Sequence, residues 1–335
     1  MFGIFKRNPT SAIVVNLLMA LSLWGRSFLQ PQQVMDDIPM MPLEYWLMQL
    51  VGTAPLLSTI VAFAFMYLLA LMLIRLSSLH FFATEQVYLP PFVFVLICSA
   101  FPLQQCMNGS YIAAFFVLLG LFQLFKVYRD ERVFVSIFLA AICISVASLF
   151  AASAIFLLTI LFLAIFFLRT PSEWRDWVIA FSGAALPYLY AFVAYMYVEN
   201  DGFTIFYLLR DCLFASSEWI FEYGSEVDWI YLGFLMFVVL LAVLMLARGL
   251  LTSRLKVQKI HTLFVWAFFI MLAVMLALPS GSMFLMPLMA LPAAVLAANY
   301  LALTRYRLIA GLIFYLLILL TFAVQYYDVA WEWFF

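Results

Sequence analysis

Charged side chains are scarce in this chain of 335 residues: Asp, Glu, Lys and Arg together make up 10% of it. Soluble domains carry about 25% charged and about 45–50% apolar residues, whereas 68% of this chain is hydrophobic. A soluble core of this size could not hide so much apolar surface, so the excess must face lipid. A basic stripe is also missing, which sets aside nucleic-acid binding.

Paired metal-ligand and redox spacings are missing too. No two of the four cysteines form a Cys-x-x-Cys pair, and His80 and His261 lie far apart without Cys or carboxylate partners at ligand spacing. We therefore expect no metal and no cofactor. Cys106 and Cys212 fall on the same side in the topology below, where a disulfide is chemically permitted, but two unpaired thiols are the simpler expectation.

Carboxylates are absent from the apolar stretches. A proton- or sodium-coupled transporter normally needs a carboxylate at membrane depth, or broken helices in inverted repeats, and the sequence shows neither. The polar groups expected at depth are Asn16, Ser145, Ser182 and Asn299, each able to bond a neighbouring helix. A transporter or flippase therefore ranks third among the functions considered.

Long apolar stretches, in contrast, recur along the whole chain, and about 20 such residues span the hydrocarbon core as a helix. We expect an all-α polytopic membrane bundle of about eleven transmembrane helices, forming one integral membrane domain over residues 1–335. The expected spans are residues 11–29, 50–74, 91–105, 111–125, 133–149, 152–168, 177–198, 229–247, 262–279, 284–302 and 308–326.

One apolar run, residues 133–168, is too long for one upright span and short for two. A turn between Ser148 and Ser153 would make it a tight hairpin. The alternative is a single long tilted helix, which would reverse the side of every later loop.

The distribution of charge favours the hairpin. With it, fourteen of the sixteen Lys and Arg residues fall on one side, and only Arg26 and Arg210 fall on the other. Twelve of the seventeen acidic residues lie opposite the basic loops. The positive-inside rule then places the N-terminus in the cytoplasm and the C-terminus outside. Lys6, Arg7 and the apolar run after them resemble a signal peptide, but no small-residue cleavage site follows, so we expect an uncleaved first span.

Two segments on the acidic side are long enough to build a site. The first, residues 30–48, holds Asp36, Asp37 and Glu44, and it is short enough to leave little room for helices beside the membrane. The second, residues 199–228, carries seven acids and Arg210. Within it, residues 203–221 are expected to form a helix lying in the interface plane.

An acidic pair soon after the first span, with a cation available for a phosphate, resembles the membrane-embedded glycosyltransferases of the C-type fold. The resemblance implies a transferase that uses a polyprenyl-phosphate-linked sugar. Asp36 or Asp37 would act as general base on the acceptor hydroxyl, and Arg26 or Arg210 would hold the lipid phosphate. The short first outer loop departs from the pattern of that family.

The central stretch resembles a second family. The motifs are Phe-Val-Ser-Ile-Phe at 134–138, Ser-Leu-Phe at 148–150, Glu-Trp-Arg-Asp-Trp at 173–177 and Leu-Pro-Tyr at 186–188. They are similar to those of uncharacterised multi-pass proteins of the bacterial inner membrane. That resemblance implies a location and an architecture but no catalytic residue. We therefore expect a non-catalytic scaffold or subunit of a cell-envelope assembly, in contact with membrane lipids and other inner-membrane proteins, with the transferase as the alternative.

Overall fold

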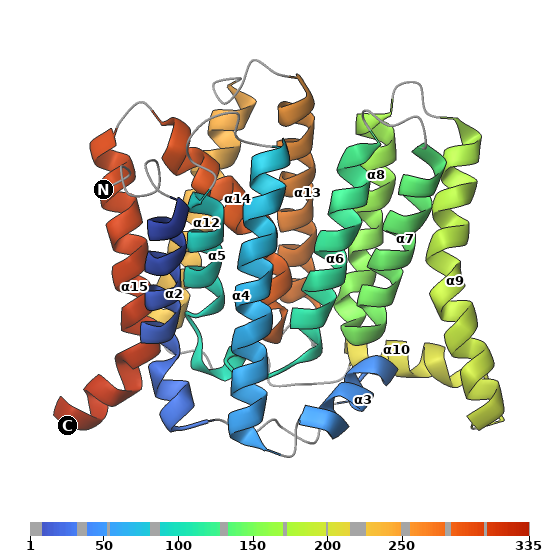
Figure 1. Ribbon diagram of the computed structural model, residues 1–335, viewed down its shortest axis with the longest axis horizontal. Helices are drawn as coiled ribbons and strands as arrows, with labels where there is room; N and C mark the ends of the chain where they lie inside the picture. Colours follow the sequence, from blue (N-terminus) through green and yellow to red (C-terminus); the bar gives the residue numbers. More distant parts are fainter. Residues whose placement is uncertain are drawn as a thin grey trace.

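The computed structural model of the chain describes residues 9–31, 39–51, 54–80, 88–127, 133–169, 173–198, 200–214, 226–248, 255–278, 283–304 and 307–334. Within these ranges every regular element is a helix, and nine helices are long and apolar enough to cross a membrane. They are α2 (Pro9–Leu29), α4 (Pro55–His80), α6 (Gly109–Lys126), α7 (Val133–Phe150), α9 (Trp174–Val198), α12 (Glu226–Ala247), α13 (Leu255–Ala277), α14 (Met286–Leu303) and α15 (Arg307–Phe334). Figure 1 shows them side by side along one common direction, as expected for a multi-pass membrane protein.

Two further apolar segments are shorter. They are α5 (Leu89–Cys98) and the pair formed by the 3-10 helix η2 (Ala152–Leu157) and α8 (Leu158–Leu168). Each of the eleven expected spans thus has a helical counterpart, but eleven crossings stays a prediction because these two are short. All ten residues of α5 are buried, and α5 packs on α14, which is itself buried over most of its length.

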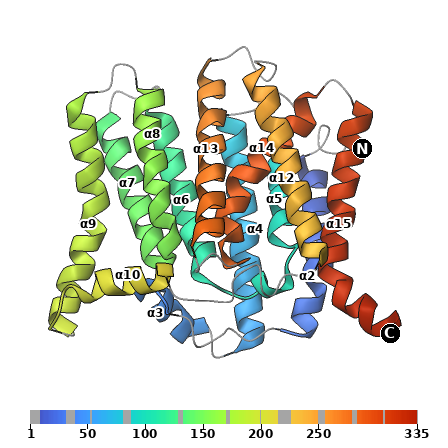
Figure 2. The ribbon, with the colours of Figure 1, turned by 180° about the vertical axis from the view of Figure 1, so that it is seen from behind.

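The hairpin expected within residues 133–168 is confirmed. Helix α7 ends at Phe150, Ala151 is extended with φ −137° and ψ 111°, and η2 begins at Ala152. The alternative of one long tilted helix is therefore wrong. Helices α7 and α8 then lie side by side (Figures 1 and 2).

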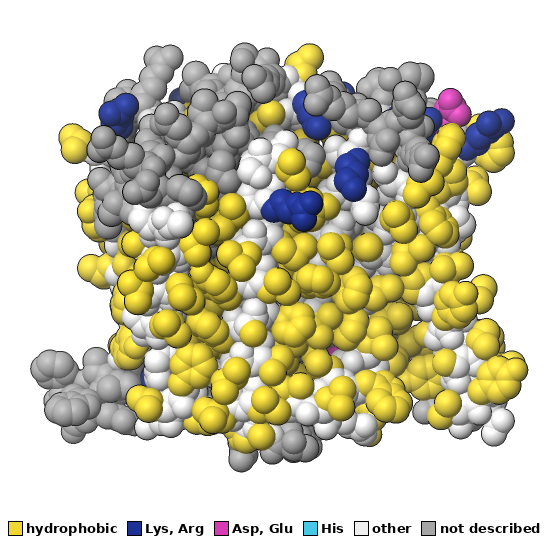
Figure 3. All heavy atoms as spheres, in the orientation of Figure 1, with side chains coloured by type: hydrophobic (Ala, Val, Ile, Leu, Met, Phe, Trp, Pro, Cys, Tyr) yellow, Lys and Arg dark blue, Asp and Glu magenta, His cyan; other side chains and the backbone are white. Residues whose placement is uncertain are grey.

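The two ends of the bundle differ in charge. Lys126 ends α6, Arg169 follows α8 and Arg248 follows α12, all at the end drawn uppermost in Figure 1. In Figure 3 the visible Lys and Arg side chains gather toward this end, and hydrophobic side chains cover the middle. We call it the basic end. Helix α2 begins near the basic end and α15 finishes at the opposite end (Figure 1).

Two short helices lie at the end opposite the basic end, α3 (Pro42–Val51) and α10 (Thr204–Phe214) (Figure 1). Helix α10 confirms that the described part of residues 203–221 is helical, its place in the membrane interface stays a prediction, and residues 215–225 are outside the described ranges. Helix α3 corrects two expectations: the segment between the first two long spans does have room for a short helix, and the second span begins at Pro55 rather than at residue 50. Pro42 and Pro55 each stand at a first helical position, where a missing N–H costs nothing.

Small residues bring α7 and α9 close together. A Cβ atom added at Gly183 would lie 2.8 Å from Cβ of Ala141 and 2.9 Å from the carbonyl oxygen of Phe138. The Ser145 hydroxyl donates to the carbonyl of Ala184 across the same interface, at 2.7 Å. Close backbone approach of this kind drives association where lipid supplies no hydrophobic force between helices.

Candidate functional site

Helices α3 and α10 dock on the bundle through a second, small hydrophobic core. Its buried members are Met41, Leu149, Ala152 and Ile205. The inward face of α10 also carries Leu209, Cys212 and Leu213, spaced as one helix face requires. We call residues 39–51 and 204–214, together with Gly109, the α3–α10 region.

Glu44 links α3 to the start of α6. Its carboxylate accepts a hydrogen bond from the backbone N–H of Gly109, the first residue of α6, with Oε1 2.8 Å from the nitrogen. Burial raises the pKa of Glu44 from 4.5 to about 7, although hydrogen bonds from the backbone of Gly109 and Met41 act in the other direction. A carboxyl that titrates near neutral pH can serve as a general acid or base.

Cys212 ties α10 to the segment before α3. Its thiol donates to the carbonyl of Pro39 at 3.3 Å. Burial, followed by the nearby charges of Glu44 and Asp211, raises the pKa of this thiol to about 12. The thiol is therefore protonated and unreactive at neutral pH. Cys106 and Cys212 are not joined by a disulfide, in agreement with the simpler of the two expectations.

Arg26 lies elsewhere, in a joint between α2 and α15. Its Nη1 donates to the carbonyl of Gln325 at 3.2 Å, and its side chain is partly buried. Next to it, the amide nitrogen of Gln105 donates to Oε1 of Gln325 at 3.2 Å and to the carbonyl of Ser99 at 3.0 Å. The hydroxyl of Ser27 completes this polar joint by donating to Oε1 of Gln105 at 2.5 Å.

Of the four sequence-predicted site residues, the structure describes Arg26 and Arg210, and it does not bring these two together. Asp36 and Asp37 lie outside the described residues, two to three positions before Pro39 in the chain. Arg210 is exposed on α10, and it stands two positions from Cys212, so the two side chains point to nearly opposite faces of that helix. Arg26 sits on α2, which is far from α10 along the longest axis of the molecule (Figures 1 and 2).

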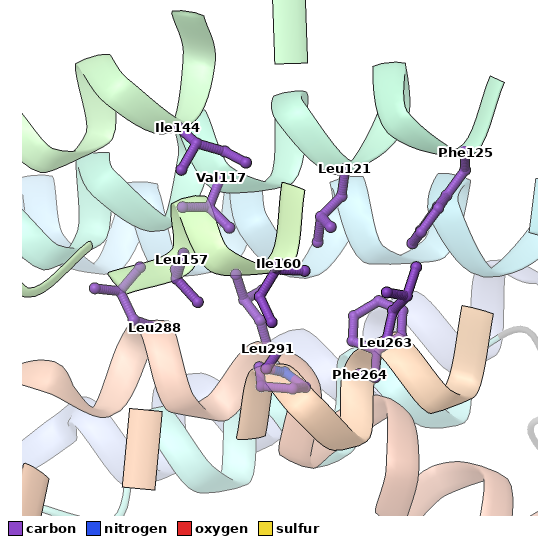
Figure 4. A pocket seen from close by; sticks show the side chains of 12 residues that line it. Val117, Leu121, Phe125, Ile144, Leu157, Ile160, Leu263, Phe264, Leu288 and Leu291 are labelled. Atoms are coloured by element: carbon purple, nitrogen blue, oxygen red, sulfur yellow. The ribbon is translucent and has the colours of Figure 1, made fainter. Parts of the chain in front are cut away.

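A cavity of about 20 Å³ lies inside the bundle, between α6, α7, α8, α13 and α14 (Figure 4). Leu121, Ile160 and Leu291 point into it, and every other lining residue is apolar as well. A space of this size has room for about one water molecule, but its wall offers no polar side chain to bind one. The cavity is therefore a packing defect rather than a substrate site.

Sequence reasoning named Glu44 only as a loop charge and missed the joint around Gln105. A signal for Glu44 existed, because it stands two positions after Pro42, in the first turn of a helix, where a negative charge is favoured. Within the described residues, no three His, Cys, Asp or Glu side chains are arranged to hold a metal ion. Comparison of the chain with protein-family models, with curated proteins and with solved structures found no match.

Proposed function

We propose that the protein is a non-catalytic scaffold or subunit of a cell-envelope assembly in the bacterial inner membrane. The observation that carries this proposal is that its buried and partly buried polar side chains join one helix to another. Gln105 and Gln325 join α15 to the segment after α5, Ser145 joins α7 to α9, and Glu44 joins α3 to α6. These groups hold helices together, which suits a rigid body that presents surfaces to partners.

The membrane and the orientation belong to the same proposal. The nine apolar helices and the gathering of cations at the basic end support a cytoplasmic basic end under the positive-inside rule. The N-terminus is then inside and the C-terminus outside. The resemblance of residues 110–200 to uncharacterised inner-membrane proteins supports the location and is itself still a prediction.

A deletion strain complemented with variants tests this function. The triple variant Asp36→Asn, Asp37→Asn, Glu44→Gln removes every carboxylate of the first outer segment while preserving side-chain size. We expect it to restore the deletion phenotype as fully as the unaltered chain does. Failure to complement, with normal abundance in the membrane, would contradict the scaffold.

One observation favours the transferase as the second candidate. Helix α3 is a helix beside the membrane between the first two long spans, and it presents Glu44, whose pKa of about 7 suits acid–base chemistry. Pro39, close to Asp37 in sequence, is held against the Arg210-bearing helix α10 by Cys212. In this case Asp36, Asp37 or Glu44 would take the proton of the acceptor hydroxyl, and Arg210 would bind the lipid phosphate.

Separate single variants distinguish the two candidates. For a transferase, Asp36→Asn, Asp37→Asn or Glu44→Gln should abolish complementation, and Arg210→Ala should weaken it. Arg307→Ala, an exposed cation at the basic end, is the matched control and should have no effect. Full complementation by all four variants removes the transferase.

A further inference from the structure

A groove runs along the outside of the bundle where α8 meets the first turns of α9. It has a volume of about 440 Å³ and is lined by Phe162, Trp177, Val178, Phe181 and Ser182. We call it the α8–α9 groove.

The groove is apolar and faces outward. Phe181 is 70% exposed and Val178 is 54% exposed, and the ring of Trp177 stacks on Phe162 with centroids 5.9 Å apart. The Ser182 hydroxyl donates to the carbonyl of Ile179 in its own helix at 2.9 Å, so it leaves no unsatisfied donor. In a chain embedded in a membrane, a shallow apolar groove on a span is open to acyl chains.

The start of α9 carries charges that are already matched to one another. The Asp176 carboxylate, which is fully buried, pairs with the guanidinium of Arg169 and accepts the backbone N–H of Glu173 at 2.9 Å. Glu173 lies 4.0 Å from the same guanidinium. Arg169 also lies over the ring of Phe134 at 5.0 Å, which fixes it between α7 and α9.

Arg175 does not belong to these paired charges at the start of α9. It is exposed and forms no ion pair with another described residue. It precedes Val178 by three positions and Ser182 by seven, so it lies on the same face of α9 as the groove. Trp174, 72% exposed, lies on that face too, four positions before Val178. The face therefore presents an exposed aromatic ring and a cation at the start of α9, followed by the apolar groove.

We propose that the α8–α9 groove and Arg175 form a binding site for one phospholipid with an anionic headgroup, in the leaflet at the basic end. Arg175 binds the phosphate by charge-assisted hydrogen bonds, and one acyl chain lies over Val178 and Phe181. The indole of Trp174, one position before Arg175, lies beside the phosphate at headgroup level, where amphipathic rings are favoured. Arg175 is about 9 Å along the helix axis from Phe181, at 1.5 Å per residue, which matches the step from a headgroup to the start of an acyl chain.

Native mass spectrometry of the full chain tests the headgroup contact, with phosphatidylglycerol and phosphatidylcholine as probes. We expect one phosphatidylglycerol to be retained in preference to phosphatidylcholine. Arg175→Ala should weaken this retention about fivefold, the worth of one cation near an anionic membrane surface. Arg307→Ala, equally exposed at the basic end, should not change it. Equal retention by Arg175→Ala and the unaltered chain, or an equal loss in both variants, would overturn the proposal.

A photo-crosslink identifies the occupant of the groove in the intact membrane. Benzoylphenylalanine in place of Phe181 keeps an aromatic ring on the groove wall. On irradiation we expect an adduct with the mass of one phospholipid, and Ser182→Trp, which fills the groove, should remove that adduct. An adduct with a polypeptide would show that a protein helix occupies the groove and would overturn the proposal.

Discussion

At the residue scale, Glu44 shows how one side chain can serve structure and remain available for chemistry. Its carboxylate caps the first N–H of α6, a position where the helix dipole favours negative charge. Burial nevertheless dominates and favours the protonated form. The carboxyl therefore holds α3 in place while titrating close to neutral pH.

This balance predicts a pH dependence of stability. The pKa of Glu44 is about 7 in the folded protein and 4.5 in the unfolded chain, so the folded state binds the proton more tightly. The stabilisation that comes from protonated Glu44 is present in full below pH 4.5 and is lost as the pH rises through about 7. We expect the melting temperature in detergent to fall between about pH 5 and about pH 8. The free-energy change should be on the order of 2 kcal/mol, less than the full value at about 1.4 kcal/mol per pKa unit, because the side chain of Glu44 is only partly buried and solvent screens it.

The variant Glu44→Gln should remove this slope, because an amide oxygen still accepts from Gly109 but does not titrate. Glu226→Gln, at an exposed carboxylate in the first turn of α12, is the control and should keep it. An unchanged slope in Glu44→Gln would show that another group causes the dependence.

At the element scale, the contact between α7 and α9 depends on a small residue. The carbonyl of Phe138 and the methyl of Ala141 lie where a side chain at Gly183 would be. Helix α9 has few other contacts along its length, and only 22% of its most apolar window is buried. The position of α9, and with it the α8–α9 groove, therefore rests on this approach.

We expect Gly183→Ala to destabilise the protein by about 1–3 kcal/mol, the usual cost of overpacking. Gly233→Ala is the matched control: Gly233 is also mid-helix, on α12, and a Cβ there meets nothing within 4 Å. It should be neutral or stabilising by up to about 1 kcal/mol, since Ala is the better helix former. Unfolding midpoints of the two variants in detergent check this, and equal midpoints would contradict the close contact.

The long helices could be predicted from the sequence, whereas the short helices α3 and α5 could not be predicted correctly. Each long helix matches an expected span, because the length of an apolar run is a direct measure of membrane crossing. Helix α3 was missed because apolar residues continue on both sides of the break before Pro55. Helix α5 was expected to reach residue 105 but ends at Cys98, because the buried segment after it is held by polar bonds of Ser99 and Gln105.

The candidate site was less predictable for a physical reason. Gln105 and Gln325 are 220 positions apart, and a single sequence carries no pattern that pairs them. Helix periodicity gives the face on which Arg210 lies but not its neighbours. The groups proposed to hold a lipid phosphate, Arg26 and Arg210, shared a side in the expected topology, yet the arrangement of helices separates them.

At the scale of the whole molecule, the proposed function places the basic end of the bundle in the cytoplasm. The cations near this end would be drawn to anionic headgroups of the inner leaflet, and their translocation would be disfavoured. The proposed lipid site belongs to this end, and the α3–α10 region belongs to the other. A reversed orientation would place the lipid site in the outer leaflet and the α3–α10 region on the cytoplasmic side.

Labelling of single introduced cysteines in intact cells tests this orientation most directly. Asp201→Cys lies at the end opposite the basic end and Lys126→Cys at the basic end, and both positions are exposed. The native cysteines are buried or partly buried, so the unaltered chain gives the background. A membrane-impermeant thiol reagent should modify Asp201→Cys in intact cells and Lys126→Cys only after the membrane is permeabilised. Modification of both in intact cells, or of Lys126→Cys alone, would contradict the orientation and every assignment made from it.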